Sequence, residues 1–148
     1  MINLILISHG AFAAGVREAA EMILGPQENL EVFGLYPGDT VETFSLKLEQ
    51  AIDAFGDPDH TLILADLPSG TPSNTAMLMV MKRHVHALSG YNLPALLELL
   101  TLREEMEAGE LIAAATEAGR EGFVNAEQVI AEREGTVSAW YFTALTTA

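Results

Sequence analysis

Short apolar runs alternate with helical patterns along most of this chain. The apolar runs cover residues 2–7, 30–36 and 61–65, and a weaker run covers residues 85–88. Short runs rich in Leu, Ile and Val that are bounded by turn-forming residues are typical of strands buried on both faces of a sheet. We therefore predict four β-strands.

The segments that follow these runs carry apolar residues at the three- and four-residue spacing of a helix face. Gly25-Pro26 ends the first helix, and Thr40 is a suitable N-cap for the second. A turn-rich stretch from Asp66 to Asn74 precedes the third helix, and Pro94 fits the first turn of the fourth. The predicted helices cover residues 11–24, 40–55, about 75–84, 94–100 and 104–122.

This alternation of strands and helices predicts an α/β fold. We expect an open, mainly parallel, doubly wound sheet of strand order 2-1-3-4, with helices on both faces and right-handed crossovers. The length of 148 residues suits a single domain spanning residues 1–148, of which the residues after about 125 form a C-terminal extension.

The C-terminal extension has a less regular pattern. Phe123-Val124 is predicted to begin a strand, and residues 126–133 are predicted to form a helix. Trp140-Tyr141-Phe142 places three aromatic side chains together, and such a group is rarely left exposed on a soluble monomer. These aromatic residues either pack on a neighbouring subunit or belong to an atypical extension of the domain, and the pattern leaves both interpretations open.

Composition and charge narrow the functional classes. The net charge is −14, from 21 acidic and 7 basic residues, which argues against binding nucleic acid or anionic lipid and is compatible with a basic protein partner. The absence of cysteine excludes disulfides and thiolate metal sites. No apolar run reaches the roughly 20 residues of a membrane span, and the N-terminus lacks the basic residues of a signal peptide. We expect a cytoplasmic location.

Two strand ends carry side chains suited to chemistry. His9 follows the first predicted strand, and Asp66 follows the third. In a sheet of order 2-1-3-4 these strands are neighbours, and their helices leave on opposite faces. Open α/β sheets bind their ligands at this switch point, so we expect His9 and Asp66 to face each other there.

The residue types at this switch point indicate phosphoryl transfer. A neutral imidazole can accept a phosphoryl group on one nitrogen while a carboxylate accepts the N–H of the other, so His9 and Asp66 are the predicted catalytic residues. The predicted phosphate-binding residues are Gly10, Gly70 and Thr71, through close backbone approach, backbone N–H groups and a hydroxyl. We predict no cofactor and no metal.

Each feature taken alone has a structural alternative. His9 can be a loop residue, Asp66 can cap the next helix, and Thr71-Pro72 can simply begin a helix. His84 and His86 have a spacing compatible with a metal site, but no third ligand is evident, and His84 suits a helix C-terminus. The combination of His9, Asp66 and Thr71 at one switch point favours the phosphoryl-transfer interpretation.

Several motifs resemble those of a known family, the EIIA components of the mannose-type sugar phosphotransferase system. The resemblance covers about residues 1–125 and rests on Ile7-Ser-His9-Gly-Ala-Phe, Ile23-Leu-Gly-Pro-Gln-Glu-Asn29, Tyr36-Pro-Gly-Asp39, Ala65-Asp66-Leu-Pro-Ser-Gly70-Thr71-Pro-Ser-Asn74 and Ser89-Gly-Tyr-Asn-Leu-Pro94.

The resemblance implies a phosphocarrier that accepts a phosphoryl group on His9 from the protein HPr and passes it to an EIIB component on a separate chain. EIIB then serves the membrane permease components EIIC and EIID, which would bring this chain to the inner membrane indirectly. The family's aspartate falls on Asp66 and its loop hydroxyl on Thr71. Family members are homodimers that exchange a last, antiparallel strand, and the sugar contacts only the permease.

Two other functions remain open on the sequence. One is the phosphoryl-donor subunit of a dihydroxyacetone kinase, which has a similar domain and histidine but usually lacks a Gly-Thr-Pro turn. The other is a non-enzymatic regulatory module that holds an anion in the same pocket. Gly70-Thr71-Pro72 places this chain nearer to the sugar systems.

Overall fold

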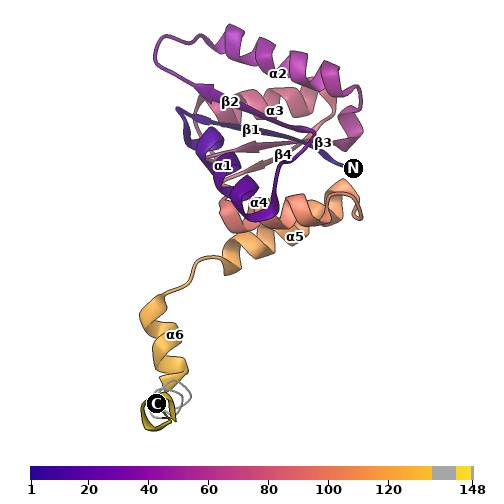
Figure 1. Ribbon diagram of the computed structural model, residues 1–148. Helices are drawn as coiled ribbons and strands as arrows, with labels where there is room; N and C mark the ends of the chain where they lie inside the picture. Colours follow the sequence, from indigo (N-terminus) through magenta and orange to yellow (C-terminus); the bar gives the residue numbers. More distant parts are fainter. Residues whose placement is uncertain (135–142, 148) are drawn as a thin grey trace.

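The computed structural model describes residues 1–134 and 143–147 and contains the predicted alternation of strands and helices (Figure 1). In chain order the elements are β1 (Asn3–His9), α1 (Phe12–Leu24), β2 (Leu30–Leu35), α2 (Val41–Phe55), a short 3-10 helix η1 (Pro58–His60), β3 (Thr61–Ala65), α3 (Thr71–Arg83), β4 (His86–Ser89), α4 (Leu93–Leu102), α5 (Ala108–Glu121) and α6 (Ala126–Glu132).

The four strands form one parallel sheet of order β2-β1-β3-β4, as predicted. β1 is paired on both sides, with Ile7 opposite Phe33 of β2 and opposite Ala65 of β3. This register brings the carboxyl ends of β1 and β3 to the same edge of the sheet, so His9 and Asp66 leave adjacent strands.

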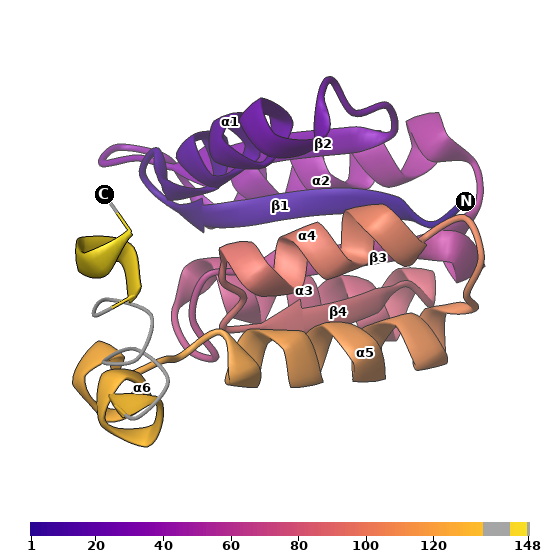
Figure 2. The same ribbon diagram turned by 60° about the horizontal axis from the view of Figure 1, so that its bottom comes forward.

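Helices cover both faces of the sheet, and alternate strand residues belong to two separate cores. Leu4 and Leu6 of β1 pack under α1, α4 and α5, whereas Ile5 and Ile7 pack under α2 and α3. Figure 2 shows α1, α4 and α5 together on the near side of the sheet, with α2 and α3 behind it. Because α1 and α3 lie on opposite faces, the switch point between β1 and β3 is present as predicted.

Two predicted boundaries near the site, one of a strand and one of a helix, need correction. β1 extends to His9, so His9 is the last residue of the strand rather than part of the turn. The third helix begins at Thr71 and not after Asn74, because the Asn74 N–H already donates to the Gly70 carbonyl at 3.0 Å. Pro72 fits this first turn because a proline there removes an N–H that has no partner within the helix.

The structure also corrects predictions further along the chain. The predicted helix over residues 104–122 begins only at Ala108, because residues 103–106 form the turn that ends α4. Phe123-Val124 does not begin a strand: these two residues and Asn125 connect α5 to α6 without regular structure. The predicted helix over residues 126–133 is confirmed as α6, which lies apart from the sheet in both views (Figures 1 and 2). Trp140-Tyr141-Phe142 lies outside the described residues.

Thr40 is the predicted N-cap of α2, and its side chain accepts a hydrogen bond from the Thr43 N–H at 3.1 Å. Asn92 caps α4 in the same way through the Ala95 N–H, at 3.0 Å. Within the described part of the chain, none of the helices has the length and apolar character needed to cross a membrane.

Stability is expected to depend on the two central strands. Leu64 of β3 is fully buried in the core under α1, so Leu64→Ala should lower the free energy of unfolding by about 3 kcal/mol, through lost burial and a cavity. Urea unfolding followed by circular dichroism measures this change. Met22→Ala is the control: Met22 is 83% exposed on α1, and its loss should cost no more than about 0.5 kcal/mol. Equal losses in the two variants would contradict the assignment of the core.

Candidate active site

The switch point brings His9 and Asp66 into direct contact. Nδ1 of the His9 ring lies 2.9 Å from Oδ2 of Asp66, and the backbone N–H of His9 donates to the same oxygen at 3.0 Å. The other carboxylate oxygen accepts the N–H of Leu67 at 3.0 Å. The Asp66 side chain is 12% exposed and the His9 side chain 49% exposed. The carboxylate is therefore held in place, while part of the imidazole faces solvent.

The electrostatics of the pair identify the ring tautomer. Burial raises the pKa of the Asp66 carboxyl, but the hydrogen bonds from the His9 backbone and ring and from Leu67 outweigh this effect, so its pKa lies below the ordinary value. An ionised carboxylate can only accept hydrogen bonds. Nδ1 of His9 must therefore carry the proton in this contact, which leaves the lone pair of the neutral ring on Nε2.

The Nε2 edge of the ring lies against Gly70. A Cβ atom on Gly70 would be 3.3 Å from Nε2 and 3.2 Å from Cε1 of His9, and the φ angle of Gly70 is +93°. Both the space and the backbone conformation favour glycine. The absence of a side chain leaves the backbone beside the nitrogen that carries the lone pair.

Gly70 is also the N-cap residue of α3, so the free end of this helix lies beside Nε2. The cap supplies no side-chain hydrogen bond, and the first N–H groups of a helix have no partner within it. Thr71 is the first residue of the helix, and its carbonyl accepts the Thr75 hydroxyl at 2.8 Å. Unpaired N–H groups and the positive end of the helix dipole favour an anion at this position.

The turn after β1 contributes less to an anion site than the sequence suggested. The Gly10 N–H donates to the Leu35 carbonyl at 2.8 Å, so this group is already paired. Ser8 accepts the Ala13 N–H at 2.8 Å and thereby caps the start of α1. The φ angle of Gly10 is +54°, so its role in the structure is to let the chain turn sharply between His9 and α1.

Gly34 of β2 lies against this turn, and the sequence analysis did not identify it as a residue that shapes the site. A Cβ atom on Gly34 would lie 2.3 Å from the Gly10 carbonyl oxygen and 2.8 Å from the Tyr36 ring. Gly34 pairs with Ser8 in the sheet. A side chain at position 34 would therefore push on the Gly10 carbonyl, next to His9. An isolated glycine within an apolar strand was the available signal, since it marks a close approach of another backbone.

The remaining histidines lie away from the switch point. His60 is in η1 and its side chain is 43% exposed, with Nδ1 3.0 Å from Oδ2 of Asp57. His84 is the left-handed residue after α3, and His86 begins β4 with Nε2 3.1 Å from the Asp59 carbonyl oxygen. Among the described residues, no three His, Asp or Glu side chains are grouped as a metal site.

The arrangement combines a nucleophilic nitrogen with a place for an anion. Nε2 has a lone pair and is accessible, the carboxylate on the opposite side of the ring offsets positive charge that develops there, and the end of α3 favours negative charge. These are the requirements for forming a bond from the ring to an electrophilic, negatively charged group such as a phosphoryl group.

Comparisons with known proteins agree with this chemistry. Residues 3–116 match the family model EIIA-man, described as the PTS (phosphotransferase system) fructose IIA component. The chain is 33% identical over 113 residues to the fructose-specific EIIA component of Bacillus subtilis, which covers 76% of this chain and 77% of that protein. It is 35% identical over 123 residues to the mannose-specific EIIAB component of Escherichia coli K12, covering 82% of this chain but only 38% of that longer protein.

Two solved structures are similar as well. The phosphotransferase system component EIIA from Streptococcus agalactiae superposes with a TM-score of 0.81 at 26% identity, covering 86% of this chain and 99% of that one. The mannose/sorbose-specific IIA subunit from Enterococcus faecalis has a TM-score of 0.75 at 28% identity, covering 84% and 93%.

The low pKa of Asp66 predicts a pH-dependent contribution to stability. A carboxyl whose pKa is lowered by folding stabilises the folded state above its ordinary value of 3.8 and loses this effect as the pH falls through the folded value. Asp66→Asn should therefore lower the free energy of unfolding by about 1 kcal/mol at pH 6 and by less at pH 3. Urea unfolding of both proteins at the two pH values measures this difference.

The control for this prediction is Asp57→Asn. Asp57 also contacts a histidine ring, but its side chain is 52% exposed, so its replacement should have a smaller effect at pH 6. A stability loss for Asp66→Asn that is the same at both pH values would contradict the prediction.

Proposed function

Because the chain belongs to the fructose/mannose-type EIIA family of the sugar phosphotransferase system, we propose that His9 is the residue that carries its phosphoryl group. The protein is a phosphocarrier for sugar uptake and works through a phosphohistidine. The observation that supports His9 most directly is its contact with Asp66, which leaves Nε2 free beside Gly70.

The proposed step is an in-line transfer between two imidazoles. The Nε2 lone pair of His9 attacks phosphorus, the P–N bond to the donor histidine breaks, and that electron pair returns to the donor ring. The proton on Nδ1 stays in place, so positive charge develops on the His9 ring. Asp66 accepts the Nδ1–H throughout and offsets this charge.

The phosphoryl oxygens are held by backbone in this proposal. Gly70 allows them to approach the chain, and the first N–H groups of α3 and the Thr71 hydroxyl donate to them. Gly10 contributes by shaping the turn, since its own N–H is paired with Leu35. Neutral donors suit a group that must be passed on, because they hold the phosphate without the strong attraction of a buried cation.

The family implies HPr as the phosphoryl donor and an EIIB component as the acceptor. Both partners must reach the same nitrogen, Nε2 of His9, so they bind in turn rather than together. We propose that this exchange takes place in the cytoplasm, at the membrane when EIIB is bound to the EIIC and EIID permease. We also propose that residues 1–148 act as one EIIA domain with a C-terminal extension.

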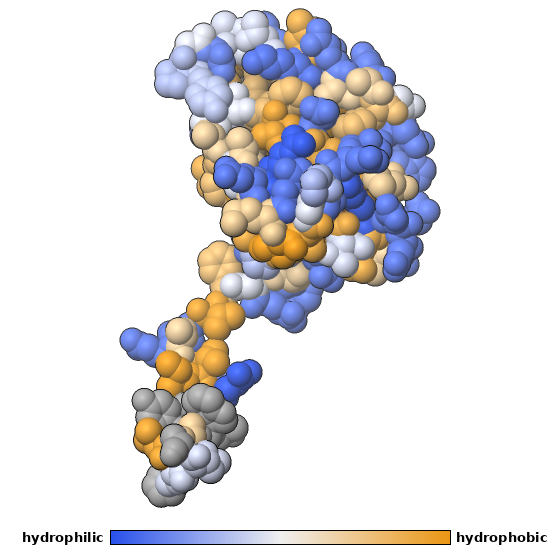
Figure 3. Space-filling view, viewed as in Figure 1, coloured by the Kyte–Doolittle hydropathy of each residue, from blue (hydrophilic) through white to orange (hydrophobic). Residues whose placement is uncertain are grey.

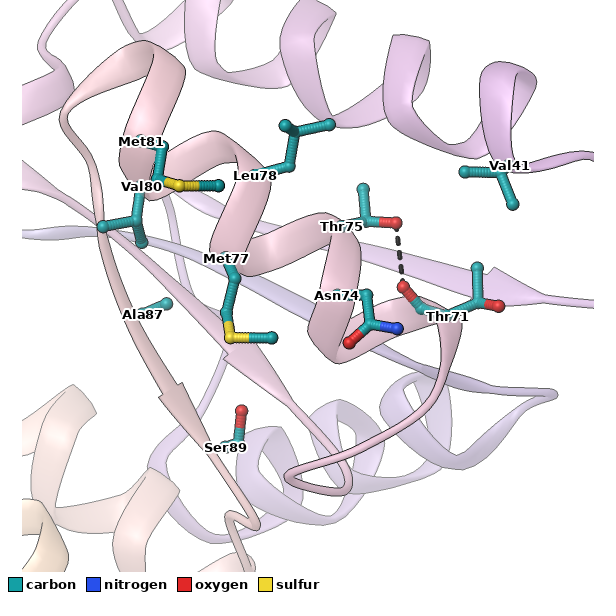
Figure 4. A pocket seen from close by; sticks show the side chains of 10 residues that line it. All are labelled: Val41, Thr71, Asn74, Thr75, Met77, Leu78, Val80, Met81, Ala87 and Ser89. Atoms are coloured by element: carbon teal, nitrogen blue, oxygen red, sulfur yellow. Dashed lines mark hydrogen bonds between the residues drawn. The ribbon is translucent and has the colours of Figure 1, made fainter.

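We further propose that the protein is a homodimer, with a segment after Gly122 crossing to the partner's sheet as a last antiparallel strand. β4 is at the edge of the sheet, where one side of a strand has no neighbouring strand in the described chain. Beside it lies an apolar groove of about 780 Å³, lined by α3 and β4. Figure 4 shows Met77, Val80 and Met81 projecting from α3 and Ser89 from β4 around this groove.

The C-terminal extension has side chains that suit such a groove. Phe123, Val124 and Ile130 are 84%, 65% and 59% exposed. Figure 3 shows hydrophobic surface along this extension, below the body of the molecule. Apolar side chains on an extension and an apolar groove at a sheet edge favour burial of one by the other in a second copy.

Labelling with phosphoenolpyruvate tests the proposed function. With enzyme I and HPr present, the wild-type chain should acquire one phosphoryl group, and His9→Gln should acquire none, because the accepting nitrogen is lost. Phosphate incorporation measured by mass spectrometry under non-acidic conditions gives the stoichiometry. His60→Gln is the matched control, since His60 also pairs with an aspartate but lies at η1; it should label fully. Normal labelling of His9→Gln would refute the proposal.

Sedimentation tests the proposed dimer. Met81→Glu places a charge in the groove beside β4 and should weaken self-association at least tenfold, because a buried charge without a partner is costly. Met22→Glu introduces the same charge on α1, away from the groove, and should sediment as the wild type does. A monomeric wild-type protein, or equal weakening by both substitutions, would contradict this assignment.

A further inference from the structure

Tyr91 has a buried hydroxyl with no hydrogen-bond partner in the part of the chain that the structure describes. The residue is 5% exposed and lies in the loop between β4 and α4. Burying a hydroxyl without a partner costs on the order of 1 kcal/mol or more, so such groups are rare in folded proteins. A phenylalanine would fill the same space without this cost.

The backbone places Tyr91 next to the candidate active site. Ala65 of β3 pairs with Ser89 of β4, and the Gly90 N–H donates to the Ala65 carbonyl at 2.8 Å. Asp66 and Tyr91 therefore follow adjacent strands at the same edge of the sheet. Asp66 is one residue beyond the pair Ala65 and Ser89, and Tyr91 is two residues beyond it.

Tyr91 lies on the face of the sheet that α1, α4 and α5 cover. Leu62 and Leu64 of β3 belong to the core under these helices. Tyr91 belongs to the same core. Its ring packs on the ring of Phe12, the first residue of α1, with centroids 5.7 Å apart and planes at 57°. The position of the hydroxyl is therefore set by packing.

The hydroxyl is available as a donor. Burial, and after it the negative charge of Asp66, raise the pKa of Tyr91 far above the physiological range, so the phenol keeps its proton. Within the described chain the titratable groups that interact with this carboxylate are His9 on β1 and Tyr91 itself. The charge coupling agrees with the placement derived from the strand register.

The carboxylate has capacity for one more donor. Oδ2 of Asp66 accepts both the backbone N–H and the Nδ1–H of His9, whereas Oδ1 accepts only the Leu67 N–H. Each carboxylate oxygen has two lone pairs, so Oδ1 can accept a second hydrogen bond.

We propose that Tyr91 is a positioning residue that acts through Asp66: its buried hydroxyl donates to one buried water, which in turn donates to Oδ1 and so holds the carboxylate against the His9 ring. The hydrogen bond stabilises the ionised carboxylate and takes up part of its charge. Asp66 then holds the ring tautomer at lower pH and attracts the positive charge on the ring less strongly. This inference rests on the proposed role of His9.

Tyr91→Phe removes only the hydroxyl and keeps the contact with Phe12, so it tests the proposal without opening a cavity. The measurement is the initial rate of His9 phosphorylation by phospho-HPr between pH 3 and pH 8. Without the donor, the Asp66 carboxylate becomes easier to protonate, and the Nδ1–H tautomer of His9 that it holds is lost at a higher pH. The acid limb of the rate profile should therefore move up by about 0.5 pH unit, the effect of one hydrogen bond of modest strength.

Tyr36→Phe is the matched control, because Tyr36 is half exposed and loses the same hydroxyl. Its acid limb should coincide with that of the wild type. An acid limb in Tyr91→Phe that also coincides with the wild type, whatever the change in the plateau rate, would overturn the role assigned to Tyr91. Failure of the wild-type chain to label on His9 would instead overturn the proposed function.

Discussion

The hydrogen bond between Nδ1 of His9 and Oδ2 of Asp66 is the interaction on which the interpretation of this structure depends. It joins the ends of two adjacent parallel strands, and the two residues are separated by 57 positions in the sequence. Because the ionised carboxylate accepts from Nδ1 and from the His9 backbone, the ring can offer only Nε2 to a partner. A change in strand order or register would separate these groups and remove the chemistry.

The proposed phosphoryl site lies on a strongly acidic protein. The chain has a net charge of −14, and the groups that adjoin His9 are a carboxylate and a glycine at the start of α3. In the proposed site, attraction for the phosphoryl group comes from backbone N–H groups at the helix N-terminus and not from the overall field. A moderate, local attraction is consistent with a carrier that releases what it accepts, and the acidic surface favours partners with basic docking surfaces.

The C-terminal extension is structurally separate from the sheet and its covering helices. Residues up to Gly122 form the sheet and its covering helices, and the extension after it leaves that body. The prediction of a strand at Phe123-Val124 was wrong for the single chain, because a strand needs a neighbouring edge to pair with and this segment leads away from β4. Pattern alone does not distinguish a segment that pairs within its own chain from one that pairs elsewhere.

The sequence alone was sufficient for the strands, most of the helices, the strand order and the pairing of His9 with Asp66. These follow from local patterns and from general rules of α/β topology, which leave few arrangements for alternating elements. Tertiary structure alone decided the rest. Three features depend on contacts between strands and loops that are distant in sequence: the Gly10 N–H donates to Leu35, Gly34 lies against the Gly10 carbonyl, and the Tyr91 hydroxyl is buried without a partner in the described chain. Such contacts have no periodic signal, because they depend on the angle at which each chain segment leaves the sheet.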